Sequence, residues 1–487
     1  MSFEKDGSVN ALRFGLAGNC GSSPDLSDAI VDRAMFHSDN AYFYPHILID
    51  GLRCKTHTVS NTAFRGFGGP QGMLAAETVM DEIAFALQMD PLDVRKKNFY
   101  DHGDGARNIT PYHQTVEHFT VPQLVEQLES TSDYRNRRTQ IREYNRNSKI
   151  LKKGIALTPV KFGISFTATH LNQAGALLHL YTDGTVHLNH GGTEMGQGLF
   201  TKVAQVVSAE LGVALDAIKI SSTRTDKVPN TSPTAASSGS DLNGMAALNA
   251  ARKIKARLLE HVANVHQCDE NAVSFAADGV SISGSVVMSW SALAHSAWMA
   301  RISLSATGFY KTPEIYYDRD KSRGRPFLYY ANGAAVSEVV IDTLTGESRL
   351  LRTDILHDVG SSINPAIDIG QIEGGFIQGL GWLTTEELVW NKDGRLLSDG
   401  PATYKIPAIG DAPAEFNVRL LEDAPNPAPT VMRSKAVGEP PLMLALSVWC
   451  ALRDAVAAAG EYRKFPVLNA PATAEEILRC VDEVVGG

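Results

Sequence analysis

Two short glycine turns, each flanked by apolar runs, constrain the fold of this chain more than any other sequence feature. Asp183-Gly184 lies within the apolar stretch Ala174–His190, and Thr345-Gly346 separates Val336–Ile341 from Ser348–Ile355. Turns of this composition join neighbouring antiparallel strands. Because the strands come as hairpins with helical segments between them, and not as a regular alternation of single strands and helices, the pattern predicts an α+β fold.

Other segments carry apolar residues at helical spacing, and a capping box marks the start of one more helix near the C-terminus. The helices expected from these signals are Gln71–Gln88, Gly196–Leu211, Asn243–Val262, an apolar helix over 441–459, and a short helix that begins at Thr473 and Glu476.

A charged stretch suggests where the chain divides. In Ser130–Lys153 arginine and lysine alternate with acidic residues, which predicts an exposed helix before a boundary near residue 150. The polar stretch Asp101–Gln114 is expected to be a loop. We therefore expect two domains, 1–148 and 149–487.

The N-terminal segment predicts an incomplete hairpin. The turn Asp6-Gly7 precedes an expected strand, Val9–Leu16, but too few residues precede the turn to form a full partner strand. We expect the chain to begin inside its first domain, with the missing part on another polypeptide. The first ten residues contain acidic side chains and no apolar core, so they do not resemble a signal peptide.

Composition narrows the class of protein. The net charge is −9 and no block of lysine or arginine occurs, which argues against binding to nucleic acid. The five cysteines form no CxxC pair and no HExxH motif occurs, so no zinc or iron–sulfur site is expected from this chain alone. Such cysteine usage suits a reducing cytoplasm. The most apolar run, Pro441–Gly460, is interrupted by Arg453 and Asp454, which favours a buried helix over a membrane span.

Five segments combine glycine, amide, hydroxyl and charged residues in a way that a hydrophobic core does not require. Asn61–Gln71 precedes a helix, and its glycines allow a close backbone approach or an anion at the helix N-terminus, although a tight turn is the plainer interpretation. In Ala436–Pro441, Glu439 precedes two prolines at a helix start, where the dipole favours an ionised carboxylate. Such a group can act as a general base, whereas most glutamates at this position only cap the helix.

The other three segments fit either a ligand site or an ordinary structural role. In Gly191–Gly198 the amide of Gln197 could read the edge of a heterocycle, or the segment is a strand-to-helix loop. Thr231–Ser238 is rich in small donors, as an N-cap would be. Gly370–Gly379 is helical in pattern but holds four glycines, each costing about 1 kcal/mol against alanine. Close packing on a helix or a cofactor is the usual reason.

Taken in order, these segments resemble the molybdenum hydroxylase family. The resemblance extends from about residue 9 to the C-terminus, and the ordered set is too specific to arise by chance. It implies two mixed α+β molybdopterin-binding domains, the first incomplete in this chain. The strings that carry it are NTAFRGFGGPQG, KFGISFT, LNQAGAL, GGTEMGQG, PNTSPTAAS, DVGSSINPAIDIGQ, GPATYKIPA and SKAVGEPPL.

The resemblance implies a molybdenum cofactor (Mo-pterin, in mononucleotide or dinucleotide form) whose metal is held through the pterin and not by protein side chains. Glu439 corresponds to the catalytic general base beside the metal. The residues expected along the molybdopterin or close to it are Arg65, Gln197, Ala236, Ser237, Gln371 and Gln378.

The resemblance also implies a substrate site. Phe67 and Phe166 correspond to two rings that sandwich a flat heterocycle, and Thr167 to a hydroxyl that orients it. Arg33 matches an arginine of the purine-hydroxylating members that aldehyde oxidases typically lack, so we expect xanthine or hypoxanthine as substrate and urate as product. The plainer alternative for Arg33 is a surface ion pair with a neighbouring aspartate.

The resemblance implies partners as well. The family's molybdenum portion begins with a segment that this chain does not contain, and the iron–sulfur and FAD modules are also absent from it. We therefore expect partner chains that carry the first part of the molybdenum portion, the iron–sulfur clusters and FAD. No nucleic acid or membrane partner is expected.

Two alternatives stay open on the sequence. One is an aldehyde or N-heterocycle oxidoreductase of the same family, against which Arg33 argues. The other is a non-catalytic scaffold with a degenerate site. The joint presence of the residues expected at the substrate and the general base argues against a scaffold.

Overall fold

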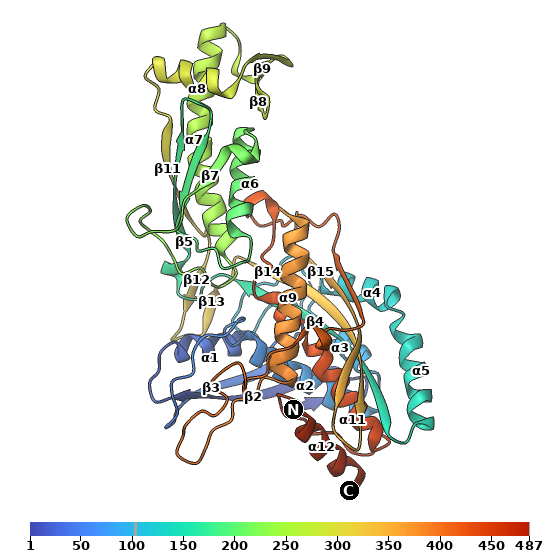
Figure 1. The fold of residues 1–487 in the computed structure, drawn as a ribbon. Coiled ribbons are helices and arrows are strands. Elements are labelled where there is room, and N and C mark those ends of the chain that lie inside the picture. The colour runs from blue at the N-terminus through green and yellow to red at the C-terminus, as the bar shows by residue number, and fades with distance from the viewer. Residues whose placement is uncertain (102–104, 487) are drawn as a thin grey trace.

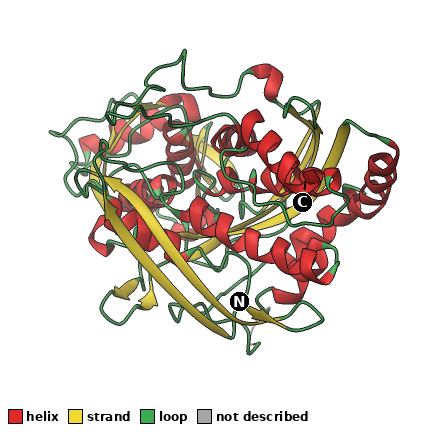
Figure 2. Cartoon of the chain, turned by 90° about the horizontal axis from the view of Figure 1, so that it is seen from below, coloured by secondary structure: helices red, strands yellow, loops and turns green. Residues whose placement is uncertain are grey.

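The computed structural model describes residues 1–101 and 105–486 and has the expected α+β fold (Figure 1). Helices and strands are mixed throughout, as the view from below also shows (Figure 2). An elongated lobe built around α6 and α7 extends from one end of the molecule, and both termini lie at the other end in Figure 1. The bounds of these two helices are Leu199–Leu211 and Gly239–His266.

Two sheets form the body of the molecule. The larger has the order β16-β15-β14-β4, with antiparallel neighbours except for the parallel pair β15–β16. In the smaller sheet β2 pairs antiparallel with β1 and parallel with β3. The strands are β1 (Ser2–Phe3), β2 (Val9–Gly21), β3 (His46–Lys55), β4 (Leu151–Ile164), β14 (Tyr329–Asp342), β15 (Ser348–His357) and β16 (Glu415–Leu420).

Helices cover both faces of the larger sheet. Because side chains alternate along a strand, Ala335 and Val339 of β14 face a core shared with α9 and α11, whereas Ala334 and Val336 face a core shared with α2 and α4. The helices of the body are α1 (Ser27–Phe36), α2 (Gly69–Leu87), α3 (Pro91–Asn98), α4 (Val121–Thr131), α5 (Tyr134–Asn147), α9 (Pro365–Thr384), α10 (Pro440–Met443), α11 (Leu446–Ala459) and α12 (Ala474–Gly486).

The lobe has its own core, in which α6 and α7 pack on a sheet of order β11-β5-β6-β7. A small sheet and α8 (Trp290–Met299) form its tip (Figure 1). The strands of the lobe are β5 (Gln173–Leu180), β6 (Val186–His190), β7 (Ile218–Ile220), β8 (Val273–Ala276), β9 (Gly279–Ile282), β10 (Ser285–Met288) and β11 (Ser305–Lys311), and the short pair β12 (Tyr316–Asp318) and β13 (Arg323–Arg325) follows.

The structure confirms the predicted hairpins and helices. Gly184 and Gly346 turn between β5 and β6 and between β14 and β15, with φ of +87° and +75°. Gly7 turns between β1 and β2. The predicted helices correspond to α2, α6, α7, α10 with α11, and α12. Of the predicted loop Asp101–Gln114, residues 102–104 lie outside the described residues.

The prediction of one exposed helix over Ser130–Lys153 is wrong in two respects. The chain breaks at Asp133, which has a left-handed φ of +54°, and Lys153 already belongs to β4. One face of α5 is also buried, because Arg137 and Arg138 form ion pairs with carboxylates of the sheet and of α11. The division of the chain at residue 148 stays a prediction.

The apolar run near the C-terminus lies inside the protein. Among the described residues, Pro440–Ala459 is the helical stretch long and apolar enough to cross a membrane, with a mean hydropathy of 1.6. However, 89% of its most apolar window is buried against the rest of the chain. This stretch is a core helix, as its sequence predicted.

The glycines of α9 allow it to approach α10. A Cβ atom at Gly379 would collide with the carbonyl oxygen of Leu442 and lie 2.8 Å from the Cβ of Ala445. We expect Gly379→Val to lower the free energy of unfolding by about 1–3 kcal/mol, because neither backbone can move without disturbing the core. Denaturant titration of the purified chain measures this effect.

Gly374 provides the matched control in the same helix. No atom lies within 4 Å of a Cβ built at this position, and the residue is exposed. Gly374→Ala should therefore stabilise the chain by up to about 1 kcal/mol through helix propensity alone. Equal effects of the two substitutions would contradict the close-packing explanation.

Candidate functional site

A cavity of about 760 Å³ lies where the lobe meets the body. Its wall is made by α1, the loops before α2 and after β4, the segments that lead into α6 and α7, the start of α9 and the segment before α10. The cavity brings together residues from seven separate segments of the sequence. The sequence-predicted residues that line it are Arg33, Arg65, Phe67, Phe166, Thr167, Gln197, Ala236, Ser237, Gln371 and Glu439.

Glu439 is held at the cavity wall by donors from two other segments. Its Oε1 accepts a hydrogen bond from the amide of Gly66 (3.3 Å), and its Oε2 accepts one from the hydroxyl of Ser237 (3.1 Å). The same hydroxyl accepts the Glu439 amide N–H at 2.6 Å. The carboxylate makes no capping hydrogen bond to α10. The interpretation of Glu439 as an ordinary helix cap is therefore wrong, although it occupies the N-cap position.

Arg33 lies beside this carboxylate and is only 3% exposed. Its two terminal nitrogens donate to the carbonyl oxygens of Ser165 (2.8 Å) and Gly163 (2.6 Å), and one lies 4.0 Å from Oε2 of Glu439. Burial lowers the pKa of Arg33, and the charge of Glu439 acts in the opposite direction. The alternative of a surface ion pair for Arg33 is wrong.

The neighbouring aspartates have other partners. Asp32 pairs with Arg53 and Arg319, and Asp39 pairs with Lys161. The guanidinium of Arg33 instead lies over the buried rings of Phe162 and Phe327, 4.6 and 4.8 Å from their centres. Arg33 is therefore a cavity residue fixed by aromatic and carbonyl contacts.

The glycine-rich loop before α2 presents Phe67 to the cavity. Phe67 has a φ of +52°, and a Cβ at the following Gly68 would collide with the carbonyl oxygen of Ile30 in α1. These glycines therefore bring the loop close to the helix that carries Arg33, whereas the sequence suggested a ligand or a tight turn. The loop geometry fixes Phe67 and Arg33 relative to each other.

Phe166 and Thr167 follow β4 in a loop tied by one asparagine. Asn172 accepts the amide N–H of Phe166 (2.8 Å) and donates to its carbonyl oxygen (2.9 Å). Within the described residues, neither Phe67 nor Phe166 forms a contact with another aromatic ring of the chain. Both rings line the cavity, so both can contact a flat molecule bound there.

Arg65 connects the glycine-rich loop to α9 and to the segment before α10. Its Nε donates to the carbonyl oxygen of Gly438 (2.6 Å), and its terminal nitrogens lie 3.2 Å from Oε1 of Gln378 and 3.5 Å from the carbonyl oxygen of Gln371. Gln378 is the one predicted residue that does not line the cavity. It lies behind Arg65 and orients it.

Gln197 and the Ala236-Ser237 pair lie on loops with strained or tightly bonded backbone. The Gln197 amide donates to the carbonyl of Thr193 (2.8 Å) and accepts from the amide of Met195 (2.5 Å). Ala236 and Ser237 have consecutive positive φ angles of +54° and +58°. Such strain concentrates at functional sites, where the surrounding fold holds it in place.

The sequence did not predict four buried charged residues of the cavity, namely Lys202, Asp241, Asp368 and Lys435. Lys202 forms an ion pair with Asp368. Asp241 accepts a hydrogen bond from the hydroxyl of Tyr329 (2.7 Å), and this hydroxyl accepts one from the amide N–H of Ala436 (2.9 Å). For Lys202 the sequence did hold a signal, because this lysine lies at helical spacing from the apolar residues of α6 and so falls on the buried face of that helix.

Asp241 should make stability depend on pH. Burial raises its pKa to about 7, against which the Tyr329 hydrogen bond and the charge of Lys202 act. The folded state therefore binds a proton more tightly than the unfolded state, so this contribution is full below about pH 4 and is lost as the pH rises through 7. Between these pH values the unsubstituted chain should lose on the order of 4 kcal/mol of its free energy of unfolding. Asp241→Asn, which does not titrate, should not show this loss.

Thermal or denaturant unfolding at pH 5 and pH 8 tests this expectation. The unsubstituted chain should lose more stability over this interval than Asp241→Asn, in which the amide oxygen can still accept from Tyr329. Parallel stability profiles would show that Asp241 does not titrate as expected.

The cavity residues fit a molybdopterin cofactor. Within 1–101 and 105–486, no three His, Cys, Asp or Glu side chains come together as a metal-binding group. The wall instead offers guanidinium groups, amides and hydroxyls, together with phenylalanine rings and the left-handed backbone at Ala236. These groups match the hydrogen-bonding edge and the flat surface of a pterin.

Comparison with known proteins agrees with this fit. The molybdopterin cofactor-binding domain family matches residues 1–99 and 127–413. Xanthine dehydrogenase/oxidase of Gallus gallus is 47% identical over 99% of this chain and 34% of its own length, and xanthine dehydrogenase 2 of Arabidopsis thaliana is 46% identical over 99% and 35%. The chain thus spans about a third of the length of these relatives.

Solved structures show the same fold. Quinoline 2-oxidoreductase of Pseudomonas putida 86 matches with a TM-score of 0.85 and 23% identity, covering 99% of this chain and 61% of that one. Aldehyde oxidoreductase of Desulfovibrio gigas matches with a TM-score of 0.78 and 25% identity, covering 98% and 48%. The matched domains, the fold and the cavity agree: the chain belongs to the molybdopterin cofactor-binding domain family of the molybdenum hydroxylases.

Proposed function

We propose that this chain is the catalytic molybdopterin-binding component of an enzyme that hydroxylates a purine, xanthine or hypoxanthine to urate, as a xanthine dehydrogenase does. The observation that carries the proposal is the placement of Glu439 and Arg33 in one cavity, with a guanidinium nitrogen 4.0 Å from the carboxylate and with Phe67 and Phe166 in the same wall. Relatives named xanthine dehydrogenase that match nearly the whole chain support it.

In this proposal Glu439 is the general base. Its carboxylate is 12% exposed, so it reaches the cavity while two donors fix its orientation. A carboxylate held in this way accepts a proton from the attacking oxygen as the new carbon–oxygen bond forms. Ser237 and Gly66 position the base and do not react.

Arg33 and the aromatic rings select the substrate. Stacking between Phe67 and Phe166 favours a flat heterocycle, and Thr167 offers a hydroxyl to one of its polar groups. The guanidinium of Arg33 stabilises negative charge that develops on a purine carbonyl or ring nitrogen during attack. An aldehyde has no second carbonyl for this contact, which favours purine over the aldehyde alternative.

The net reaction replaces a C–H bond by a C–OH group, with water as the oxygen source, and releases two electrons and two protons. The molybdenum cofactor, when bound, supplies the oxygen-transfer and two-electron redox chemistry. Arg65, Gln197, Gln371 and the backbone at Ala236 would hold its pterin. We propose that iron–sulfur clusters and FAD on partner chains take the electrons, that a further chain completes the first domain, and that the assembly is cytoplasmic.

The test is purification of the complex that a tagged copy of this chain forms in its host. We expect molybdenum and pterin in the complex, and a kcat/KM for xanthine well above that for a small aromatic aldehyde. A higher kcat/KM for the aldehyde or for quinoline would favour the related oxidoreductases. A complex without molybdenum would favour a scaffold.

A further inference from the structure

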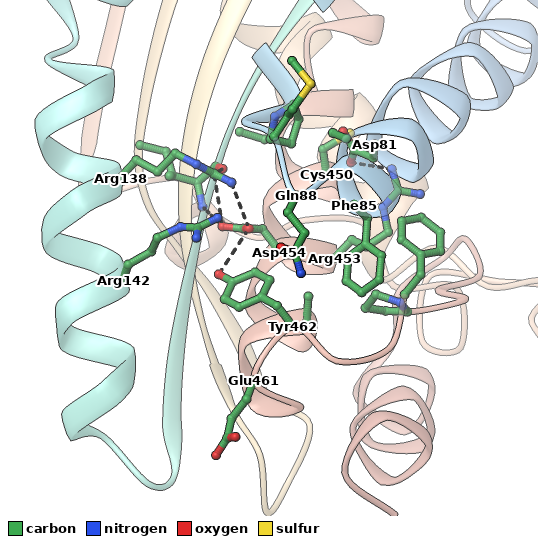
Figure 3. A pocket seen from close by; sticks show the side chains of 18 of the residues that line it. Asp81, Phe85, Gln88, Arg138, Arg142, Cys450, Arg453, Asp454, Glu461 and Tyr462 are labelled. Atoms are coloured by element: carbon green, nitrogen blue, oxygen red, sulfur yellow. Dashed lines mark hydrogen bonds and ion pairs between the residues drawn. The ribbon is translucent and has the colours of Figure 1, made fainter. Parts of the chain in front are cut away.

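A second cavity of about 420 Å³ lies along the C-terminal half of α11, between this helix, the end of α2 and α5 (Figure 3). Among the described residues, its lining shares no member with the cavity that holds Glu439. Its volume falls within the range of about 300–1,000 Å³ that is common for small-molecule sites. The proposed function makes no use of it.

The carboxylates inside this cavity are already neutralised. Asp81 accepts hydrogen bonds from Arg95 (2.6 Å) and Arg453 (2.5 Å). Asp454 forms an ion pair with Arg138 (3.4 Å) and accepts a hydrogen bond from the hydroxyl of Tyr462 (3.3 Å). These acids therefore leave no net negative charge for an incoming cation.

Arg142 of α5, by contrast, is a cation without an acidic partner. Its guanidinium lies 4.8 Å from the ring centre of Tyr462, and no carboxylate of the described residues lies within the 4 Å of an ion pair. In Figure 3 the guanidinium of Arg142 and the amide of Gln88 point into the cavity, whereas the carboxylate of Glu461 points away from it. Two donors thus face the same space.

The remaining wall is apolar and aromatic. Phe85 and Phe465 meet edge to face, with ring centres 5.5 Å apart, and Arg453 stacks over Trp449 and Phe465. An exposed ring edge and a ring face are the surfaces on which another aromatic ring packs. The apolar members of the lining include Ala84, Phe85, Met89, Ala457, Phe465 and Pro466.

We propose that this cavity binds an aromatic monocarboxylate, whose carboxylate pairs with Arg142 and the Gln88 amide and whose ring packs against Phe85 and Phe465. One negative charge matches the single unneutralised cation, and the apolar wall accommodates the ring. A phosphate would place two charges and no apolar body in the same space. The α10–α11 stretch begins next to Glu439, and the ligand would contact the C-terminal half of the same stretch.

Calorimetric titration of the full 487-residue chain with benzoate, and with benzamide as a neutral probe of the same shape, tests the proposal. We expect saturable binding of benzoate and none of benzamide. Arg142→Gln should weaken benzoate binding at least about tenfold, the usual effect of losing a charge-assisted hydrogen bond. Arg146→Gln is the matched control, because Arg146 is exposed on the same helix one turn later and does not line the cavity.

A second variant keeps the test independent of any effect on α5. Gln88→Glu places a carboxylate at the donor side of the cavity, and Gln88 is exposed at the end of α2, so the fold should persist. It should weaken benzoate binding as Arg142→Gln does. Absence of saturable binding would overturn the proposal, as would equal affinity of Arg142→Gln and Arg146→Gln, which would place benzoate elsewhere, for example in the Glu439 cavity.

Discussion

Glu439→Gln should slow reduction of the enzyme by xanthine about 10²–10⁴-fold, the usual effect of removing a general base. The amide keeps the size of the carboxylate and can still accept from Gly66 or Ser237, so fold and cofactor content should not change. Single-turnover reduction followed by absorbance measures this step directly.

Glu373→Gln supplies the control for this experiment. Glu373 is exposed on α9, two residues from Gln371, and its substitution removes the same charge without entering the cavity. It should leave the rate of reduction unchanged. A fully molybdenum-loaded Glu439→Gln enzyme that is reduced at a near-normal rate would refute the assignment of the base and would leave Asp241 and Asp368 as the cavity carboxylates to examine.

Arg33→Met should lower kcat/KM for xanthine about 10–100-fold, which corresponds to a charge-assisted hydrogen bond of about 1.5–3 kcal/mol. The structure adds a second effect, because the substitution leaves the carbonyl oxygens of Gly163 and Ser165 without their donor. This second effect disturbs the loop before Phe166 and should affect every substrate. The specific effect is therefore the ratio of the losses for xanthine and for a small aromatic aldehyde.

Arg33→Lys distinguishes the effect of the positive charge from the effect of the planar guanidinium group with its two hydrogen-bond donors. A lysine keeps the positive charge but cannot reproduce two parallel hydrogen bonds, so we expect an intermediate loss for xanthine. Steady-state kinetics with both substrates gives the ratios. Equal losses for purine and aldehyde in Arg33→Met would show that Arg33 only holds the loop and does not contact a purine.

The sequence predicted those parts of the fold that depend on local patterns. The turns at Gly184 and Gly346 were recognisable because a left-handed residue between two apolar runs has few other uses. The burial of Arg137 was not, because it follows from ion pairs with Glu338 and Asp354, which are distant in sequence. A charged helix gives no local sign that one of its faces will be buried.

The site was predictable in its residues but not in its contacts. Resemblance identified Glu439 and Arg33, yet no sequence pattern shows that Ser237 both donates to the carboxylate and accepts its amide N–H. The glycines around Phe67 suggested ligand binding, and the structure shows that they bring a loop against α1. Asp241 was missed because a polar residue in the first turn of a helix usually serves the helix end.

The most direct test of the account locates the metal. Crystals of the complex that contains this chain, measured at the molybdenum absorption edge, should show one anomalous peak in the 760 Å³ cavity, next to the carboxylate of Glu439 and on the side faced by Phe67 and Phe166. That result would place the proposed base and the substrate rings around one reaction centre. A molybdenum peak outside this cavity, or a complex active on xanthine without molybdenum there, would contradict the account.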